Sequence, residues 1–167
     1  MGEYFYYVNH DRKLLFDIGL NAFNEKFSGI GWGGIATRAF CLLLTQVTQD
    51  RYSHNLIGSW IGDLVSISGD YSEWYEKFDS YQNITANMIL MLYQIDGAEM
   101  LIEAAKTNDY LFLQIGYLIY SNQFSAISPE FENTFGNLWS KKYKQLLEKY
   151  SDHRYYDLVE INLNQMQ

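Results

Sequence analysis

The stretch GSWIGDLVSISGDYSEW, residues 58–74, constrains the fold most strongly, because a short apolar run lies in it between two Gly-Asp pairs. Residues 57–68 alternate in the manner of a β-strand. The apolar face would carry Ile61, Val65 and Ile67. Glycine accepts tight-turn backbone angles and aspartate bonds nearby backbone, so Gly69-Asp70 predicts the turn that ends this strand. A strand at this place requires a sheet to pair with.

Asp63 is the residue that conflicts with this pattern, since strict alternation places its carboxylate on the apolar face. A carboxylate there is costly unless it is paired or hydrogen-bonded. Either Asp63 is a functional acid, or Gly62 forms a bulge that turns it outward, and the pattern favours the bulge. If Asp63 points inward, its candidate donors are Arg38, Arg51, His54 and backbone N–H groups at the glycines.

The rest of the chain predicts an α+β fold in one domain over residues 1–167. Aromatic residues at 4–8, turn residues at 9–12 and an extended run ending at Gly19 indicate a β-hairpin. Helical patterns begin at Ile35, Thr85 and Pro129, and residues 109–121 fit either a helix or a strand, with helix favoured. We expect a small antiparallel sheet from the N-terminal half covered by these helices, and a mainly helical C-terminal half.

Two side chains are expected in the core on the basis of their helical neighbours. Cys41 lies within the apolar run IATRAFCLLLTQV, where a buried role is favoured over a nucleophilic one. Trp139 belongs to a single long helix that starts at Pro129, and it should be mostly buried. The apolar stripe of that helix comprises Phe131, Phe135, Leu138, Trp139, Leu146 and Tyr150.

Charge and composition limit the classes of partner. The net charge of −8 repels nucleic acid backbones and anionic membranes at long range, so we expect neither as a partner. The longest apolar run, residues 110–120, is too short to span a bilayer. A single cysteine and an N-terminus without a visible signal peptide favour a cytoplasmic location. Neither a metal nor a cofactor is expected.

No catalytic motif is recognisable, so the preferred function is a non-enzymatic protein-interaction or structural module that is acidic and rich in aromatic residues. Tyrosine and tryptophan are enriched at interface hot spots, which favours another protein as the partner. The candidate ligand-binding residues are Trp32, Arg38, His54, Trp60, Asp63 and Asp70. One alternative is a small hydrolase or metal-binding protein that uses Asp63 and Asp70 with His10 or His54. A further alternative is an inhibitor or immunity-type protein for a basic enzyme.

The N-terminal pattern also resembles a functionally uncharacterised group of small bacterial and protist proteins. These share a start of the form G-x-Y-x-x-V-N, a glycine-rich segment and a G-x-W-x-G-D strand ending in G-D-Y. The matching residues lie in roughly the first 75 positions: Gly2, Val8, Asn9, Trp60, Gly62, Asp63, Gly69, Asp70 and Tyr71. The resemblance implies a shared N-terminal core and carries no catalytic role with it.

Overall fold

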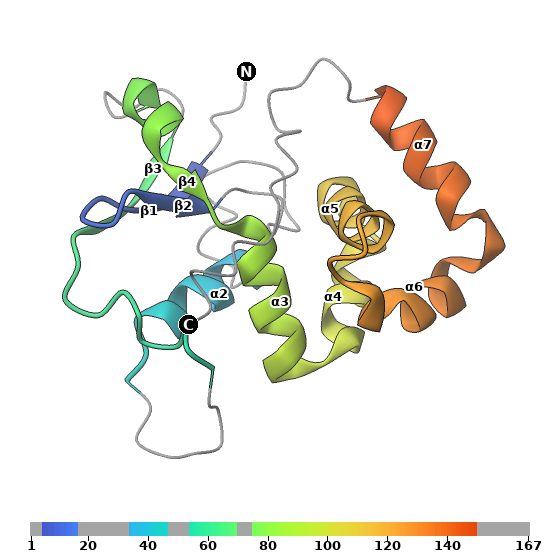
Figure 1. Cartoon of the computed structure of the whole chain (residues 1–167), viewed down its shortest axis with the longest axis horizontal. Coiled ribbons are helices and arrows are strands. Elements are labelled where there is room, and N and C mark those ends of the chain that lie inside the picture. Colours follow the sequence, from blue (N-terminus) through green and yellow to red (C-terminus); the bar gives the residue numbers. More distant parts are fainter. Residues whose placement is uncertain (1–4, 17–33, 47–53, 70–74, 150–167) are drawn as a thin grey trace.

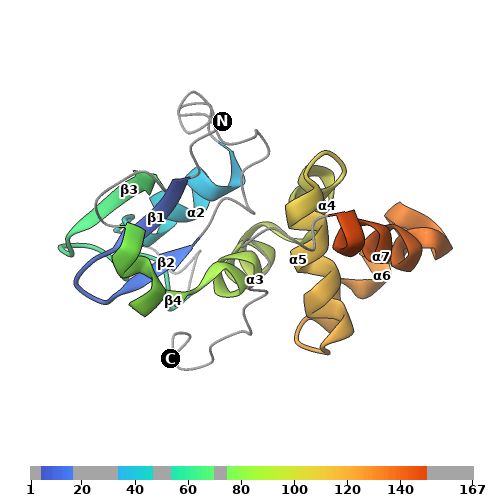
Figure 2. The same ribbon diagram turned by 90° about the horizontal axis from the view of Figure 1, so that it is seen from above.

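The structure, a computed structural model, describes residues 5–16, 34–46, 54–69 and 75–149. It has the predicted α+β arrangement, with a small sheet and one helix at one end and a group of helices at the other (Figure 1). Figure 2 shows helix α3 (Thr85–Asp96) lying between these two parts.

The predicted hairpin and its pairing with the later strand are confirmed. Strand β1 (Phe5–Asn9) pairs antiparallel with both β2 (Leu14–Phe16) and β3 (Val65–Gly69). The short strand β4 (Gln82–Asn83), which the sequence did not predict, runs parallel to β2, so the sheet is mixed rather than wholly antiparallel. The strand order is β3-β1-β2-β4.

The predicted strand over residues 57–68 is wrong for residues 57–64, where the chain mostly forms turns instead. Gly58 and Gly62 have φ angles of +73° and +86°, which a strand cannot accommodate. The N–H groups of Gly58 and Trp60 donate to the carbonyls of Leu42 and Leu43 at 2.9 and 3.0 Å, satisfying the end of helix α2 (Ile35–Leu43). A Cβ at Gly58 would lie 2.9 Å from the Thr45 carbonyl oxygen, so glycine is required there.

Helix α2 begins where it was predicted, but Cys41 is exposed rather than buried. The buried face of the helix consists of Ile35, Ala36, Ala39 and Leu43. Cys41 follows Ala39 by two residues, about 200° around the helix, and therefore lies on the opposite side.

The C-terminal half is helical, as predicted. Helices α4 (Ala98–Ala105), α5 (Asp109–Tyr120), α6 (Ser128–Phe135) and α7 (Trp139–Lys149) follow α3. Three 3₁₀ turns lie among the described elements: η3 (Tyr75–Ser80), η4 (Ser125–Ile127) and η5 (Gly136–Leu138). Residues 109–120 are thus helical, and α6 and α7 pack against α4 and α5 rather than covering the sheet (Figure 2).

The single long helix predicted from Pro129 is divided at Gly136, whose φ of +69° ends α6. Because this break rotates the following residues, the predicted apolar stripe is not continuous. Leu138 is 69% exposed and Trp139 is only half-buried, whereas Phe131 and Leu146 are buried as expected.

One apolar core joins the inner face of the sheet to the helices. Tyr7 stacks on Phe16 with ring centroids 4.9 Å apart, and Phe112 contacts Phe131 at 5.0 Å further along the same core. The outer face of the sheet has a smaller cluster of Val8, Leu15 and Phe78. Among the described residues, no helix is long and apolar enough to cross a membrane.

Candidate functional site

Polar side chains gather where the β1–β2 turn meets the start of β3. Strand alternation places successive residues of β1 on opposite faces of the sheet. Asn9 therefore follows Tyr7 on the inner face, whereas His10 follows Val8 on the outer face. The turn thus supplies polar groups to two separate clusters.

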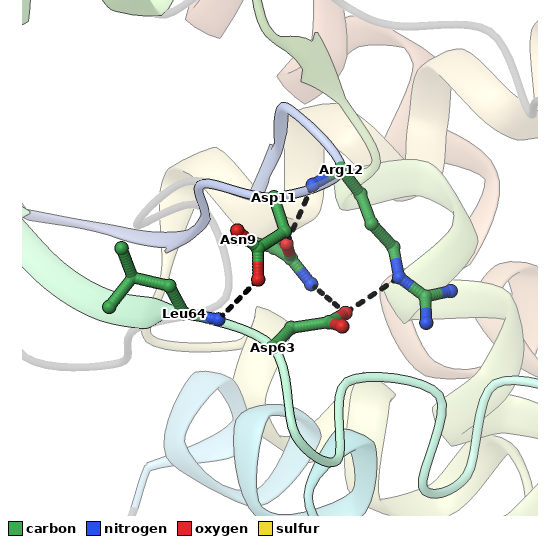
Figure 3. A network of polar contacts seen from close by, with 5 residues as sticks. All are labelled: Asn9, Asp11, Arg12, Asp63 and Leu64. Carbon is green, nitrogen blue, oxygen red and sulfur yellow. Dashed lines mark hydrogen bonds and ion pairs between the residues drawn. The ribbon is translucent and has the colours of Figure 1, made fainter.

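The first cluster surrounds Asp63 (Figure 3). Asn9 Nδ2 and Arg12 Nε both donate to Asp63 Oδ2, at 2.7 and 2.6 Å. Asn9 is fully buried, and its Oδ1 accepts the backbone N–H of Arg12 at 2.9 Å. The hydrogen bond from Asn9, together with the Arg12 guanidinium, holds the pKa of Asp63 below its usual value. Asp63 is therefore an ionised carboxylate whose partners come from the hairpin turn.

This arrangement corrects the bulge interpretation of Asp63 and the donors that were predicted for it. The residue lies in the turn that precedes β3, so no bulge forms, and its side chain is only 18% exposed rather than turned outward. The donors are Asn9 and Arg12 rather than Arg38 or His54, and Arg51 lies outside the described residues.

Asp11 holds the same turn to Leu64, the residue that follows Asp63. Its Oδ2 accepts the backbone N–H of Leu64 at 2.8 Å (Figure 3). The His10 N–H donates to the Leu64 carbonyl at 2.9 Å. Contacts to residues 63 and 64 thus come from every position of the turn from 9 to 12.

Those of the other predicted site residues that the structure describes do not join Asp63. Trp60 is 1% exposed and packs in the core against Phe16 and Phe40. Arg38 forms a two-point ion pair with Asp96 that links α2 to α3, with Nε 2.7 Å from Oδ2.

His54 is also apart from Asp63. Its Nδ1 accepts the Leu56 N–H at 3.1 Å. Burial lowers the pKa of His54, and a hydrogen bond with Gln94 partly opposes this effect. Trp32 and Asp70 lie outside the described residues.

The second cluster, on the outer face, was not predicted. His10 Nε2 lies 2.7 Å from Ser66 Oγ, and Ser66 Oγ lies 2.7 Å from Ser68 Oγ. On the other side of the ring, His10 Nδ1 is 3.3 Å from the Tyr81 hydroxyl. The serines at alternate positions of a predicted strand were the available signal, but their proximity to His10 depends on the β1–β3 register, which the sequence alone does not fix.

A third feature is the outer edge of β3. Within the described residues, β3 is an outer strand of the sheet, and its sequence VSISG has neither a charge nor a proline. Three large apolar side chains in and beside it are exposed: Ile61 by 49%, Leu64 by 61% and Ile67 by 38%. Native sheets usually protect such edges with charges, proline or bulges.

The chemistry of metal binding has little support in these contacts. Among the described residues, no group of three or more His, Cys, Asp and Glu side chains could hold a metal ion. Asp63 Oδ2 is also directed at two protein donors. Comparison with known proteins finds no matching family model, no matching curated protein and no matching solved structure. The resemblance of the N-terminal residues to an uncharacterised group stays a prediction.

Proposed function

We propose that this chain is a protein-interaction module that binds an extended segment of another protein along the outer edge of β3. The observation that carries the proposal is an uncharged, proline-free outer strand accompanied by three exposed apolar side chains. Strand addition of this kind uses main-chain hydrogen bonds for affinity and side-chain contacts for specificity.

The register of the sheet indicates which backbone groups are offered to the partner. The bond from His10 N–H to the Leu64 carbonyl marks a hydrogen-bonded pair of the β1–β3 ladder, and such pairs recur at every second residue. Ser66 and Ser68 therefore point their backbone groups toward β1. Those of Val65 and Ile67 point away from it, toward the outer edge.

The partner's chemistry follows from shape and charge. A segment that pairs with β3 must be extended and free of proline at its bonding positions. An apolar side chain on each face of the segment would cover Leu64 on one face of the sheet and Ile67 on the other, and the net charge of −8 favours lysine or arginine elsewhere in the segment. Inhibition of a basic enzyme is one role compatible with this partner.

Selection of random peptides displayed on phage against the wild-type protein tests the proposal. We expect enriched peptides to be extended, to carry apolar side chains on both faces and to bind Ile67→Pro at least ten-fold more weakly. Proline at 67 removes an outward N–H and leaves the bonds to β1 in place, so the variant should still fold. Ile67→Thr, which keeps the N–H group, should retain most of the binding.

Leu138→Lys is the matched control, because Leu138 is the most exposed large apolar side chain among the described residues and lies in η5, away from the sheet. Methylation of single backbone nitrogens of a selected peptide should abolish binding at every second residue, where the N–H groups pair with β3. Methylation at the residues between them should leave binding intact. Equal binding by wild type and Ile67→Pro, or the absence of any enriched peptide, would overturn the proposal. So would a wild-type dimer that Ile67→Pro converts to a monomer, since the occupant of the edge would then be a second copy of the chain.

A further inference from the structure

We propose that Ser66 is a nucleophile activated by His10, and that it accepts the acyl group of small aryl esters. This inference does not depend on the interaction edge, because the Ser66 side chain lies on the outer face of the sheet with Val8, whereas Ile67 points to the opposite face. The two proposals can therefore fail separately.

The geometry is that of a nucleophile, a base and a third group that orients the base. Ser66 Oγ is 2.7 Å from His10 Nε2, within the reach needed for proton transfer. Tyr81 Oη, 3.3 Å from His10 Nδ1, occupies the third position. If Nδ1–H donates to this hydroxyl, Nε2 is left to accept the proton of Ser66.

The backbone fixes the two reacting side chains on different elements. His10 belongs to the turn held by Leu64, and Ser66 is paired in register with Val8 in the adjacent strand. Residues on strands are held more precisely than residues on loops, and here Ser66 lies in β3 while the backbone N–H of His10 is bonded to Leu64 beside that strand. The relative position of Nε2 and Oγ is thus a consequence of the β1–β3 pairing.

Ser68 supplies a further hydrogen bond to the proposed nucleophile. Its Oγ is 2.7 Å from Ser66 Oγ, and Ser68 is only 7% exposed, whereas Ser66 is half-buried. With the Ser66 proton directed at His10, the Ser68 hydroxyl donates to Ser66 Oγ. That donation stabilises the negative charge that develops on Oγ as the proton leaves.

The surroundings of His10 favour its neutral form, which is the form that can act as a base. Burial is the largest effect and lowers the pKa of His10 below 6.5. Asp11 opposes the shift, Lys77 reinforces it, and Tyr81 also faces the ring. The imidazole is accordingly unprotonated near pH 7.

The reaction is an acyl transfer in which atoms balance without an oxidant or a metal. The Ser66 proton moves to Nε2 as Oγ bonds to the ester carbonyl carbon. The bond from that carbon to the phenolate breaks, and the phenolate takes the proton from Nε2. Water then repeats the sequence and releases the carboxylic acid and free Ser66.

Neighbouring aromatic rings suggest the substrate class. Phe78 lies 5.6 Å from both Tyr6 and Tyr81, and these rings share the outer face with Ser66. Aromatic pairs of this kind prefer offset or edge contacts with another ring. An aryl leaving group fits this environment better than a charged one.

Labelling with a fluorophosphonate probe, followed by peptide mass spectrometry, tests the inference. We expect one adduct per chain, located on Ser66, absent in Ser66→Ala and formed at least ten-fold more slowly in His10→Gln. Ser80→Ala is the matched control, because Ser80 is an exposed serine in η3 whose hydroxyl is bonded to the Lys77 carbonyl. It should label at the wild-type rate.

The pH dependence of labelling distinguishes activation of Ser66 by His10 from simple exposure of the Ser66 hydroxyl. Labelling of the wild type should rise with pH through a midpoint below 6.5, and His10→Gln should lose this midpoint while keeping its circular dichroism spectrum. Hydrolysis of 4-nitrophenyl acetate should show a burst that Ser66→Ala abolishes. An adduct elsewhere, labelling of Ser66 no faster than of Ser80, or an unchanged rate in folded His10→Gln would each overturn the inference.

Discussion

At the scale of single residues, Asn9 determines how the hairpin turn is held. It is fully buried, donates to the Asp63 carboxylate and accepts the Arg12 N–H. It therefore connects the hairpin turn to the segment that precedes β3. The sequence identified Asp63 as an acid that conflicts with its strand pattern, but it favoured an outward, solvated position over a partnered one. It did not identify the partners, since Asn9 and Arg12 lie 54 and 51 positions away and reach Asp63 only through the strand register.

Replacement of Asn9 should therefore destabilise the fold more than replacement of Arg12. Asn9→Ala removes the acceptor of the Arg12 N–H and one of the two donors to Asp63 Oδ2 at a fully buried position, which costs about 1–3 kcal/mol. The Arg12 side chain is 49% exposed, so Arg12→Ala should cost at most about 1 kcal/mol. Urea unfolding curves of the two variants measure the difference. Equal losses would show that Asn9 does not hold Asp63 as described.

Two histidines make stability depend on pH. The pKa values of His10 and His54 in the folded protein lie below 6.5, mainly because of burial. The unfolded chain then binds protons more readily below pH 6.5, so the free energy of unfolding should fall as pH decreases through and below that value. Asp63 titrates below 3.8 and does not contribute in this window.

Urea unfolding of the wild type near pH 7.5 and near pH 5.5 should show the lower stability at the acidic value. The double variant His10→Gln/His54→Gln should lose most of that difference. A pH difference of the same size in the double variant would mean that other groups cause it.

At the scale of elements, the sequence predicted where helices begin better than where strands and helices end. Apolar periodicity located the helices from Ile35 and Thr85. The errors occurred at Gly58, Gly62 and Gly136, which all have positive φ and interrupt patterns that look continuous in the sequence. Whether a glycine uses its left-handed conformation depends on its tertiary contacts, so periodicity could not detect these breaks.

Gly116 illustrates a glycine required for packing instead of backbone conformation. A Cβ there would lie 2.5 Å from a ring carbon of Tyr143, so α5 and α7 approach closely at this point. Gly116→Ala should cost about 1–3 kcal/mol through overpacking. The control Gly136→Ala has open space around its Cβ and should lose only about 1 kcal/mol, from backbone strain.

Thermal unfolding compares the two glycine variants, and Tyr143 provides a separate reporter of the packing. Burial raises the pKa of Tyr143 to about 12. In Gly116→Ala, displacement of the ring should bring this pKa closer to its ordinary value, as measured by ultraviolet titration, whereas Gly136→Ala should leave it unchanged. A Gly116→Ala protein with wild-type stability and titration would show that the helices are not in close contact there.

At the scale of the whole molecule, the α+β class was predictable and the arrangement of its layers was not. Strand β4 has only two residues, too few to produce a pattern, and yet it makes the sheet mixed. Helices α6 and α7 pack on α4 and α5, on the side away from the sheet (Figure 2). This position depends on which neighbour covers each helix face. Helix α3 contacts elements of both parts, and the same apolar core continues through it.

This continuity predicts that the sheet and the helical half unfold together. Leu92 lies in α3 and is fully buried, so Leu92→Ala should cost about 2–5 kcal/mol. If the core is one cooperative unit, hydrogen exchange should show equal losses of protection at the amides of Tyr7 in β1 and Leu113 in α5. Leu138→Ala, at a 69% exposed site, should change the free energy of exchange at both amides by less than about 0.5 kcal/mol. Loss of protection at Leu113 with none at Tyr7 would show that the two parts are separate folding units.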